Sequence, residues 1–267
     1  MINHFRFELS FKDINQLENK LNFCRKHGIK NINIPCKGSI KKELYISTIE
    51  HIMKKHEEFN VTFHYSLYHQ YIKNKEYSYD EFINFIRKYI TKRKYNILLL
   101  SGSNKKKNFD VLNVLEKVKE EKNLKTNFGI AYNPYLSIFD NNNSERERYE
   151  QKVLSGLINS VWLQYGTDIE VLRREIKFLK NHNVELFGSL LIPSKQFIAR
   201  FNYRPWKEVY ISEKYLCSLE NFYSFTEDLV NFYIENKIIP LVETDFYSLE
   251  KLKLIQSFIH KKSKLNS

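Results

Sequence analysis

The sequence predicts an α/β protein whose eight parallel strands close into one (β/α)8 barrel, the TIM-barrel class. Three observations support this prediction. Eight short apolar runs recur along the 267 residues, and each is followed by a segment with helical periodicity. Their spacing is roughly the 30 residues that a strand, a helix and two loops require, with a longer gap before the last. Eight such units fill about 250 residues, the ordinary length of this fold.

The expected strands are short apolar runs; Asn96–Leu100 is continuously apolar rather than alternating, because parallel barrel strands are covered on both faces. They cover Phe5–Leu9, Asn31–Ile34, Val61–Tyr65, Asn96–Leu100, Asn127–Tyr132, Ser160–Tyr165, Val184–Ile192 and Ile238–Val242.

The expected helices have apolar residues three and four positions apart. The first should begin after Asp13, with Gln16 completing a capping box, and should end at Gly28. The others cover Leu44–Lys55, Tyr79–Lys92, Val111–Glu121, Ser144–Leu157, Ile169–Asn181, Leu219–Glu235 and Leu249–His260.

No Gly-, Pro- or Ser-rich linker divides the chain, so residues 1–267 are expected to form a single domain. The segment of about 193–217, before the last strand, should contain an extra helix. The rival architecture is a doubly wound open sheet. The strand count of eight favours the closed barrel, and so does the lack of a Gly-rich dinucleotide turn after the first strand.

The charge, the apolar runs and the cysteine and histidine spacings of the sequence indicate which kinds of partner to expect. The net charge of +12 comes largely from lysines interleaved with glutamates, as at Lys117–Lys122, which is typical of solvated helix faces. We therefore expect no nucleic-acid partner. No apolar run approaches 18 residues and no signal peptide is recognised, which predicts a cytoplasmic protein without a membrane partner. The three cysteines have unrelated spacings, and His64 and His69 lack a third ligand nearby, so no metal is expected.

Catalytic groups of a (β/α)8 barrel lie on the loops that follow the strands. One of the polar residues at the predicted strand ends stands out, because Glu8 lies between Phe7 and Leu9, where an ionised carboxylate is costly without a partner. Two readings remain open: a general acid or base, or a buried structural ion pair. The strand-end residues are Glu8, Pro35-Cys36, His64-Tyr65, Ser101-Gly102-Ser103, Tyr132-Asn133, Gln164-Tyr165, Pro193-Ser194 and Glu243-Thr244.

A basic run, Lys105–Lys107, follows Ser101-Gly102-Ser103 at this predicted mouth. It could hold a phosphate or carboxylate, or it could be solvated loop charge, and the sequence does not decide between the two. The run lacks the pattern of a nucleotide-hydrolysing phosphate loop.

Short motifs in chain order resemble those of methylenetetrahydrofolate reductases. Phe5–Glu8 is similar to that family's Phe-Glu-Phe first strand, and Trp162–Tyr165 to its Thr-Gln-Phe. The other similar segments are Ile97–Ser103 (a strand ending in Arg-Gly-Asp), Gly129–Pro134 (Ala-Tyr-Pro), Lys152–Gly156 (Lys-x-x-x-Ala-Gly) and Phe187–Ser194 (a strand entering an Ile-Pro turn).

The resemblance implies reduction of 5,10-methylenetetrahydrofolate to 5-methyltetrahydrofolate with NAD(P)H, usually through bound FAD. It implies that Glu8 is the acid that protonates the folate, and that Gln164 and Tyr165 bind this substrate. The residues it assigns to the cofactor side are His64, Ser101, Gly102, Ser103, Tyr132, Asn133 and Lys152.

The departures from the family concern the flavin. Ser101-Gly102-Ser103 stands where the family has Arg-Gly-Asp, so we expect FAD binding to be weak or absent. Three readings remain open: the flavin is held differently, the hydride passes directly from NAD(P)H, or catalysis has been lost. The alternative function is a divergent barrel that binds a folate-like or other anionic ligand, or a partner protein. The sequence leaves open whether a second copy or another subunit supplies the missing groups.

Overall fold

In the computed structural model eight strands form one parallel sheet that closes on itself. The structure describes residues 4–38, 40–71, 74–91, 95–101, 109–121, 124, 126–139 and 145–260. Within them the strands are hydrogen-bonded in chain order, β1 to β8, and β8 pairs in turn with β1, where Arg6 lies opposite Leu241. The predicted fold class is confirmed.

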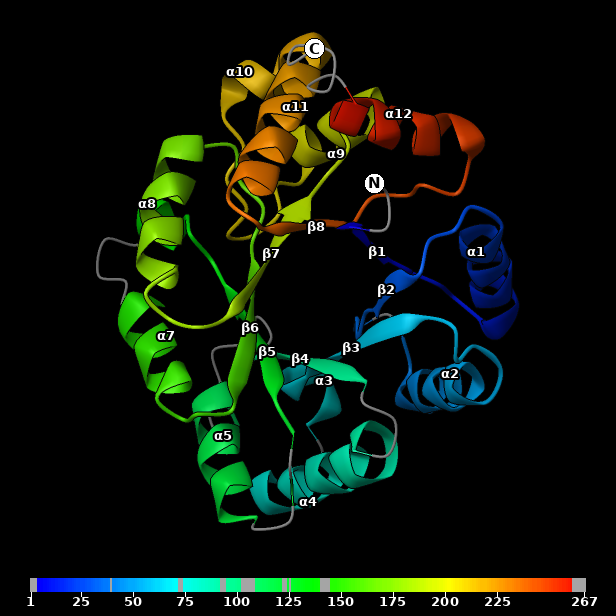
Figure 1. Ribbon diagram of the computed structural model, residues 1–267, viewed down its shortest axis with the longest axis vertical. Helices are drawn as coiled ribbons and strands as arrows, with labels where there is room; N and C mark the ends of the chain where they lie inside the picture. The colour runs from blue at the N-terminus through cyan, green and yellow to red at the C-terminus, as the bar shows by residue number, and fades with distance from the viewer. Residues whose placement is uncertain are drawn as a thin grey trace. The chain divides into compact units, whose positions relative to one another are not determined.

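Figure 1 labels these elements, and the predicted alternation of strands and helices holds along the chain. The strands are β1 (Arg6–Glu8), β2 (Asn31–Ile34), β3 (Asn60–Ser66), β4 (Asn96–Leu100), β5 (Phe128–Tyr132), β6 (Ile158–Leu163), β7 (Glu185–Leu190) and β8 (Ile239–Val242). The helices are α1 (Ile14–Lys26), α2 (Lys42–Lys55), α3 (Leu67–Gln70), α4 (Lys75–Phe85), the π-helix η2 (Ile86–Ile90), α5 (Val111–Glu120), α6 (Leu136–Phe139), α7 (Glu145–Val153), α8 (Ile169–Leu179), α9 (Lys195–Tyr203), α10 (Glu213–Leu216), α11 (Leu219–Glu235) and α12 (Leu249–His260).

The caps predicted for α1 are present. The Asp13 side chain accepts a hydrogen bond from the Gln16 amide at 2.8 Å, and the Gln16 side chain accepts one from the Lys12 amide at 2.8 Å. Gly28, just beyond the helix, has φ +69°, a conformation that costs glycine little. The segment predicted to contain an extra helix contains two, α9 and α10.

The predicted sixth strand, Ser160–Tyr165, was placed two residues late. Helix α7 ends at Val153, and Gly156 then turns the chain with φ +73°, so the predicted helix Ser144–Leu157 is too long. Leu157 already accepts a hydrogen bond from the Phe128 amide at 2.8 Å. The strand therefore begins at Ile158, and Tyr165 lies beyond its end.

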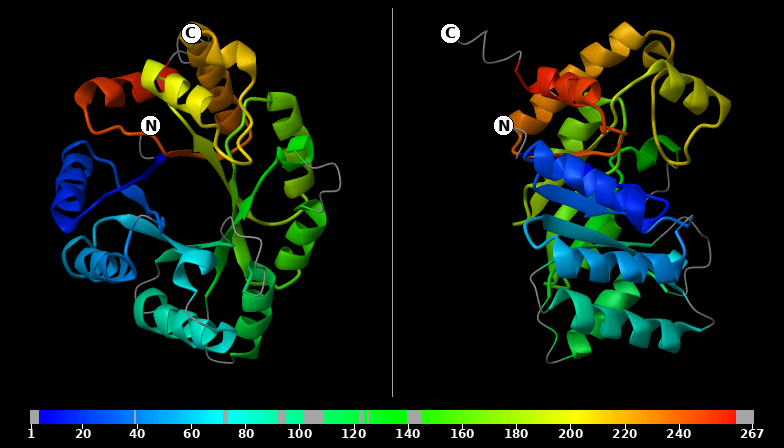
Figure 2. Two further views of the ribbon diagram at one scale, coloured as in Figure 1. Left: turned by 180° about the vertical axis from the view of Figure 1, so that it is seen from behind. Right: turned by 90° about the vertical axis from the view of Figure 1, so that its right-hand side faces the viewer.

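The chain divides into two compact units, and neither is continuous in sequence. The first unit comprises Met1–Phe7, Tyr132–Glu145 and Trp162–Ser267, and the second comprises Glu8–Ala131 and Arg146–Val161. In the second, α1 and α2 lie side by side, as Figures 1 and 2 both show.

Strand β3 shows how the second unit separates its polar and apolar faces. Tyr65 packs edge-on against Phe82 and Phe85 of α4, with ring centroids 4.9 Å apart in each pair. Side chains alternate along a strand, so Thr62 and His64 point to the opposite face, toward the barrel interior. That interior is therefore polar at β3, although both residues are buried.

Among the described residues, no helix combines the length and the apolar character that crossing a membrane would require.

In the first unit the Tyr233 ring of α11 lies directly against Gly188 of β7. The Tyr233 hydroxyl donates to the Ser189 carbonyl at 3.0 Å, and a methyl group at position 188 would lie 2.4 Å from Tyr233 Cζ. We expect Gly188→Ala to lower the free energy of unfolding by about 1–3 kcal/mol through overpacking. Urea denaturation measures this change. In a Tyr233→Ala background the same substitution should cost markedly less, and an equal cost in both backgrounds would contradict the contact.

Candidate functional site

Glu8 is the last residue of β1, where catalytic groups of this fold are found. Its carboxylate is buried and does not stand alone. Lys37, in the loop after β2, places its ammonium nitrogen 2.6 Å from Glu8 Oε1, and Ser10 donates a hydrogen bond to the same oxygen at 3.3 Å. The ion pair foreseen for Glu8 therefore exists. Because half of the Lys37 side chain is exposed, the pair connects a buried carboxylate to solvent.

A second cation contacts the β1–α1 loop. Lys20 of α1 donates from its ammonium group to the Ser10 carbonyl, while Lys37 donates to the Ser10 hydroxyl at 2.8 Å. With Lys12 and Asp13 of the turn itself, three lysines and two carboxylates thus lie at the β1–α1 turn. Their net positive charge suits a ligand that carries phosphate or carboxylate groups.

His64 lies on β3 and is buried in the polar interior, beside β2, which is also the neighbour of β1. Its Nε2 lies 2.9 Å from the Asn33 side-chain nitrogen, and its carbonyl accepts a hydrogen bond from the Tyr45 hydroxyl. Both contacts orient the imidazole and its backbone. Ser101 follows β4 and is half-buried, whereas Gly102, Ser103 and Lys105–Lys107 lie outside the described residues.

Cys36, at the end of β2, is a thiol rather than a thiolate. Burial raises the pKa of Cys36 above its ordinary value, against the opposing effect of hydrogen bonds from the Ser66 backbone and the Gln70 side chain. The Gln70 amide nitrogen lies 3.3 Å from Cys36 Sγ. This geometry gives no activated nucleophile, because the thiolate is the reactive form.

In the first unit, Gln164 and Tyr165 follow β6. The Gln164 amide donates to the Tyr132 carbonyl at 2.9 Å, and its side-chain oxygen accepts from the Tyr165 amide at 3.0 Å. Gln164 is half-exposed, so a ligand can reach it. Tyr165 is fully buried, and burial raises its pKa far above the ordinary value. These positions leave the substrate-binding role of the pair as a prediction.

Tyr132 and Asn133, at the end of β5, both bond to the protein. The Tyr132 hydroxyl donates to Glu175 of α8, so this side chain points into the helix layer. The Asn133 side chain accepts from the Tyr135 amide at 3.0 Å and donates to the Glu208 carbonyl at 3.0 Å. In the second unit, Lys152 is buried on α7.

A buried cation in the first unit was not singled out from the sequence. The Arg6 guanidinium of β1 lies 5.9 Å from the ring centroids of both Trp162 and Phe187, which stack 3.9 Å apart. Burial lowers the pKa of Arg6 to about 10, and the charge of Glu185 opposes this effect. Arg6 therefore stays charged at neutral pH, stabilised by two aromatic faces. The alternation Arg-Phe-Glu in β1 was the available signal, since it puts Arg6 on the same face as Glu8.

The described cofactor-side residues do not form a cradle for FAD. His64, Tyr132 and Lys152 are buried, and Ser101 offers no charge to a pyrophosphate or to the flavin ring. A dinucleotide requires accessible donors, such as a helix N-terminus with a Gly-rich turn. We therefore derive no chemical step through a flavin.

Fold and site define a (β/α)8 barrel with a buried, ion-paired carboxylate at the end of its first strand. No protein-family model matches the chain, and no curated protein matches it. Solved structures do match the chain. Active domain 2 of a thermostable chitinase from Pyrococcus furiosus, solved as catalytic-site mutants with chito-oligosaccharides, is 13% identical with a TM-score of 0.52. The catalytic domain of a hyperthermophilic chitinase from Pyrococcus furiosus is 12% identical with a TM-score of 0.51. Both alignments cover 96% of this chain and 95% of the other. At these identities the likeness shows the fold alone.

Proposed function

We propose that this chain is an oxidoreductase of one-carbon metabolism, similar to methylenetetrahydrofolate reductases, that reduces 5,10-methylenetetrahydrofolate with NADH or NADPH. The observation that carries the proposal is Glu8, a buried carboxylate that ends β1 and is paired with Lys37 at 2.6 Å. The resemblance assigns the proton donor to this position. The three cysteines are free thiols, which fits a reducing compartment such as the cytoplasm.

The proposed role of Glu8 follows from the chemistry of the substrate. When N10 of the folate takes a proton, its bond to the bridging carbon breaks and the electron pair stays on N10. The bridging carbon then forms a positive iminium with N5. Glu8 supplies the proton as general acid, and its carboxylate then stabilises the positive charge. The nicotinamide supplies the hydride that completes the reduction.

Lys37 replenishes the proton in this proposal. Its ammonium group contacts the Glu8 carboxylate directly, and half of its side chain lies in solvent. In the ion pair the proton is on Lys37, so Lys37 passes a proton to the Glu8 carboxylate as Glu8 protonates N10 of the folate, and the neutral Lys37 then regains a proton from bulk water. The ammonium groups of the lysines at positions 20 and 37 also favour binding of the acidic tail of a folate, because they attract its carboxylates.

The direct test is turnover by the purified protein. We expect it to oxidise NADH or NADPH only when 5,10-methylenetetrahydrofolate is present, and to form 5-methyltetrahydrofolate detectable by mass spectrometry. Activity without added FAD, from a colourless preparation, would fit the poor flavin site. Absence of the methyl product with either nicotinamide, with and without FAD, would overturn the proposal.

The second candidate is a barrel that binds an anionic ligand without catalysis. The charge around the β1–α1 turn favours it, because Lys12, Lys20 and Lys37 outnumber the carboxylates of Glu8 and Asp13 there. Calorimetric titration with 5-methyltetrahydrofolate separates the two functions. Binding that weakens in Lys37→Met, in a protein that gives no methyl product, would favour this candidate.

A further inference from the structure

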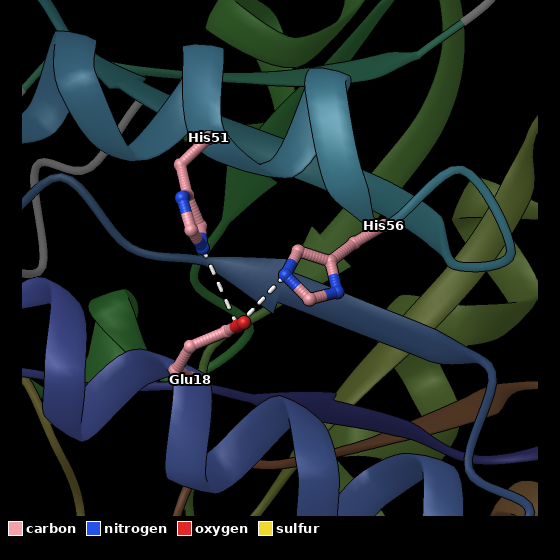
Figure 3. Close-up of side chains that lie close together, drawn as sticks. All are labelled: Glu18, His51 and His56. Carbon is pink, nitrogen blue, oxygen red and sulfur yellow. Dashed lines mark ion pairs between the residues drawn. The ribbon is translucent and has the colours of Figure 1, made fainter.

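Helices α1 and α2 of the second unit bring three metal-ligating side chains together. Glu18 projects from α1, His51 from α2, and His56 from the C-cap of α2. One ligand atom from each lies within 4.8 Å of the others. Figure 3 shows both imidazole rings directed at one carboxylate oxygen. The cluster lies in the helix layer, apart from the strand-end residues of the proposed reaction.

The contacts are close without being hydrogen bonds of normal geometry. Glu18 Oε2 lies 2.7 Å from His56 Nε2 and 3.3 Å from His51 Nε2. All three atoms are buried, and none has a hydrogen-bond partner of acceptable geometry among the described residues. Because Arg25 can only donate to His56 Nδ1, the proton of a neutral His56 lies on Nε2, beside the Glu18 carboxylate, and the two contacts are ion pairs when the imidazoles are protonated. A cation that displaces the protons would find three converging ligand atoms in place. A cation between them would satisfy all three at once.

The donor set selects the kind of cation. Two imidazole nitrogens and one carboxylate oxygen are typical ligands of Zn²⁺, and three protein ligands leave a fourth position for water. Zinc–ligand bonds of about 2.0–2.2 Å at tetrahedral angles separate neighbouring donors by about 3.3–3.5 Å. The Glu18–His51 separation of 3.3 Å already fits. The Glu18–His56 separation would have to open by about half an ångström, within the reach of side-chain rotation.

Arg25 contacts the other ring nitrogen of His56 and disfavours metal binding. Its guanidinium lies 3.0 Å from His56 Nδ1 and forms two hydrogen bonds to Glu58 at 2.7 and 3.0 Å. Arginine can only donate, whereas a histidine bound to metal through Nε2 carries its proton on Nδ1 and needs an acceptor there. Glu58 is that acceptor, with an oxygen 3.9 Å from His56 Nδ1. Arg25 is half-exposed and can turn into solvent.

We propose that Glu18, His51 and His56 bind a zinc-class divalent cation, and that Arg25 limits the affinity of this site. The bound metal links α1 to α2, and Glu58 orients His56 once Arg25 has moved. The site is independent of the proposed reductase activity, since none of its ligands lies at a strand end.

Zinc alone is the probe, added to tag-free protein in competition with a chromophoric chelator. We expect a single zinc ion per chain and a rise in melting temperature that EDTA reverses, because a ligand specific to the folded state stabilises it. His51→Ala and Glu18→Gln should each weaken binding at least about tenfold. His27→Ala removes a histidine at the C-cap of α1, outside the cluster, and should leave zinc affinity unchanged.

Arg25→Met keeps the test informative even if a ligand variant fails to fold. It removes a like charge beside the cation and frees Glu58 to accept from His56, so zinc should bind about 10–100-fold more tightly. Zinc affinity that is equal in Arg25→Met and the unmodified chain would overturn the role of Arg25. Affinity that is insensitive to both His51→Ala and Glu18→Gln would overturn the site.

Discussion

Replacing Glu8 with glutamine is expected to lower kcat for methylenetetrahydrofolate reduction by about a hundredfold or more. General acid catalysis contributes roughly 10²–10⁴-fold, and an amide cannot supply the proton. Glutamine keeps the size of the side chain and can still accept from Ser10 and Lys37, so folding and ligand binding should survive. Steady-state kinetics with NADPH measures the loss of kcat. Calorimetry serves as the control by checking that the variant still binds folate.

The Lys37→Met variant tests the supply of a proton to Glu8 separately from the donation of a proton by Glu8 to the folate. It leaves Glu8 in place and removes the cation 2.6 Å away, so we expect turnover to fall by a smaller factor than in Glu8→Gln. Turnover within about twofold of normal in Glu8→Gln would remove the acid from this position, whatever Lys37→Met does.

The second large effect concerns the core of the second unit. Phe82 of α4 is fully buried and packs against Tyr65 of β3 at 4.9 Å and Phe128 of β5 at 6.0 Å. Phe82→Ala should lower the free energy of unfolding by about 3–5 kcal/mol, the usual cost of truncating a buried phenylalanine. Much of that cost is the cavity between helix and sheet, which the surrounding rings cannot fill.

Tyr77→Ala is the matched control. Tyr77 lies on the same helix but is half-exposed, so its loss should change stability by no more than about 0.5 kcal/mol. Urea denaturation followed by circular dichroism compares the two variants. A Phe82→Ala protein as stable as the Tyr77→Ala protein would mean that α4 does not seal β3 and β5 as the structure indicates.

The eight strands could be predicted because each contains a short apolar run, continuous in β4 but alternating with polar residues in β1 and β2. The long amphipathic helices were equally visible, and α11 and α12 were predicted at their observed bounds. The single-turn helices α3 and α6 were not predicted, since four residues are too few to show a helical period. The predicted boundaries of helices and strands were wrong where a turn ends an element, as the turn at Gly156 does after α7.

The candidate site was only partly predictable. Burial between Phe7 and Leu9 marked Glu8 as needing a partner, but no local pattern identifies Lys37, which a separate strand brings to it. The cluster of Glu18, His51 and His56 was missed for the same reason. Its members have no metal-binding spacing in sequence, and they meet only because α1 and α2 pack together.

The pairing of β1 with β8 bears on how the protein is made. Arg6 lies opposite Leu241, so this edge of β1 has no partner until β8 has been synthesised. Until then one edge of β1 presents unpaired backbone groups, which are a template for association with other chains. The nascent polypeptide therefore keeps this exposed edge throughout the synthesis of β2 to β7, and a message truncated before β8 would produce a chain that keeps it permanently.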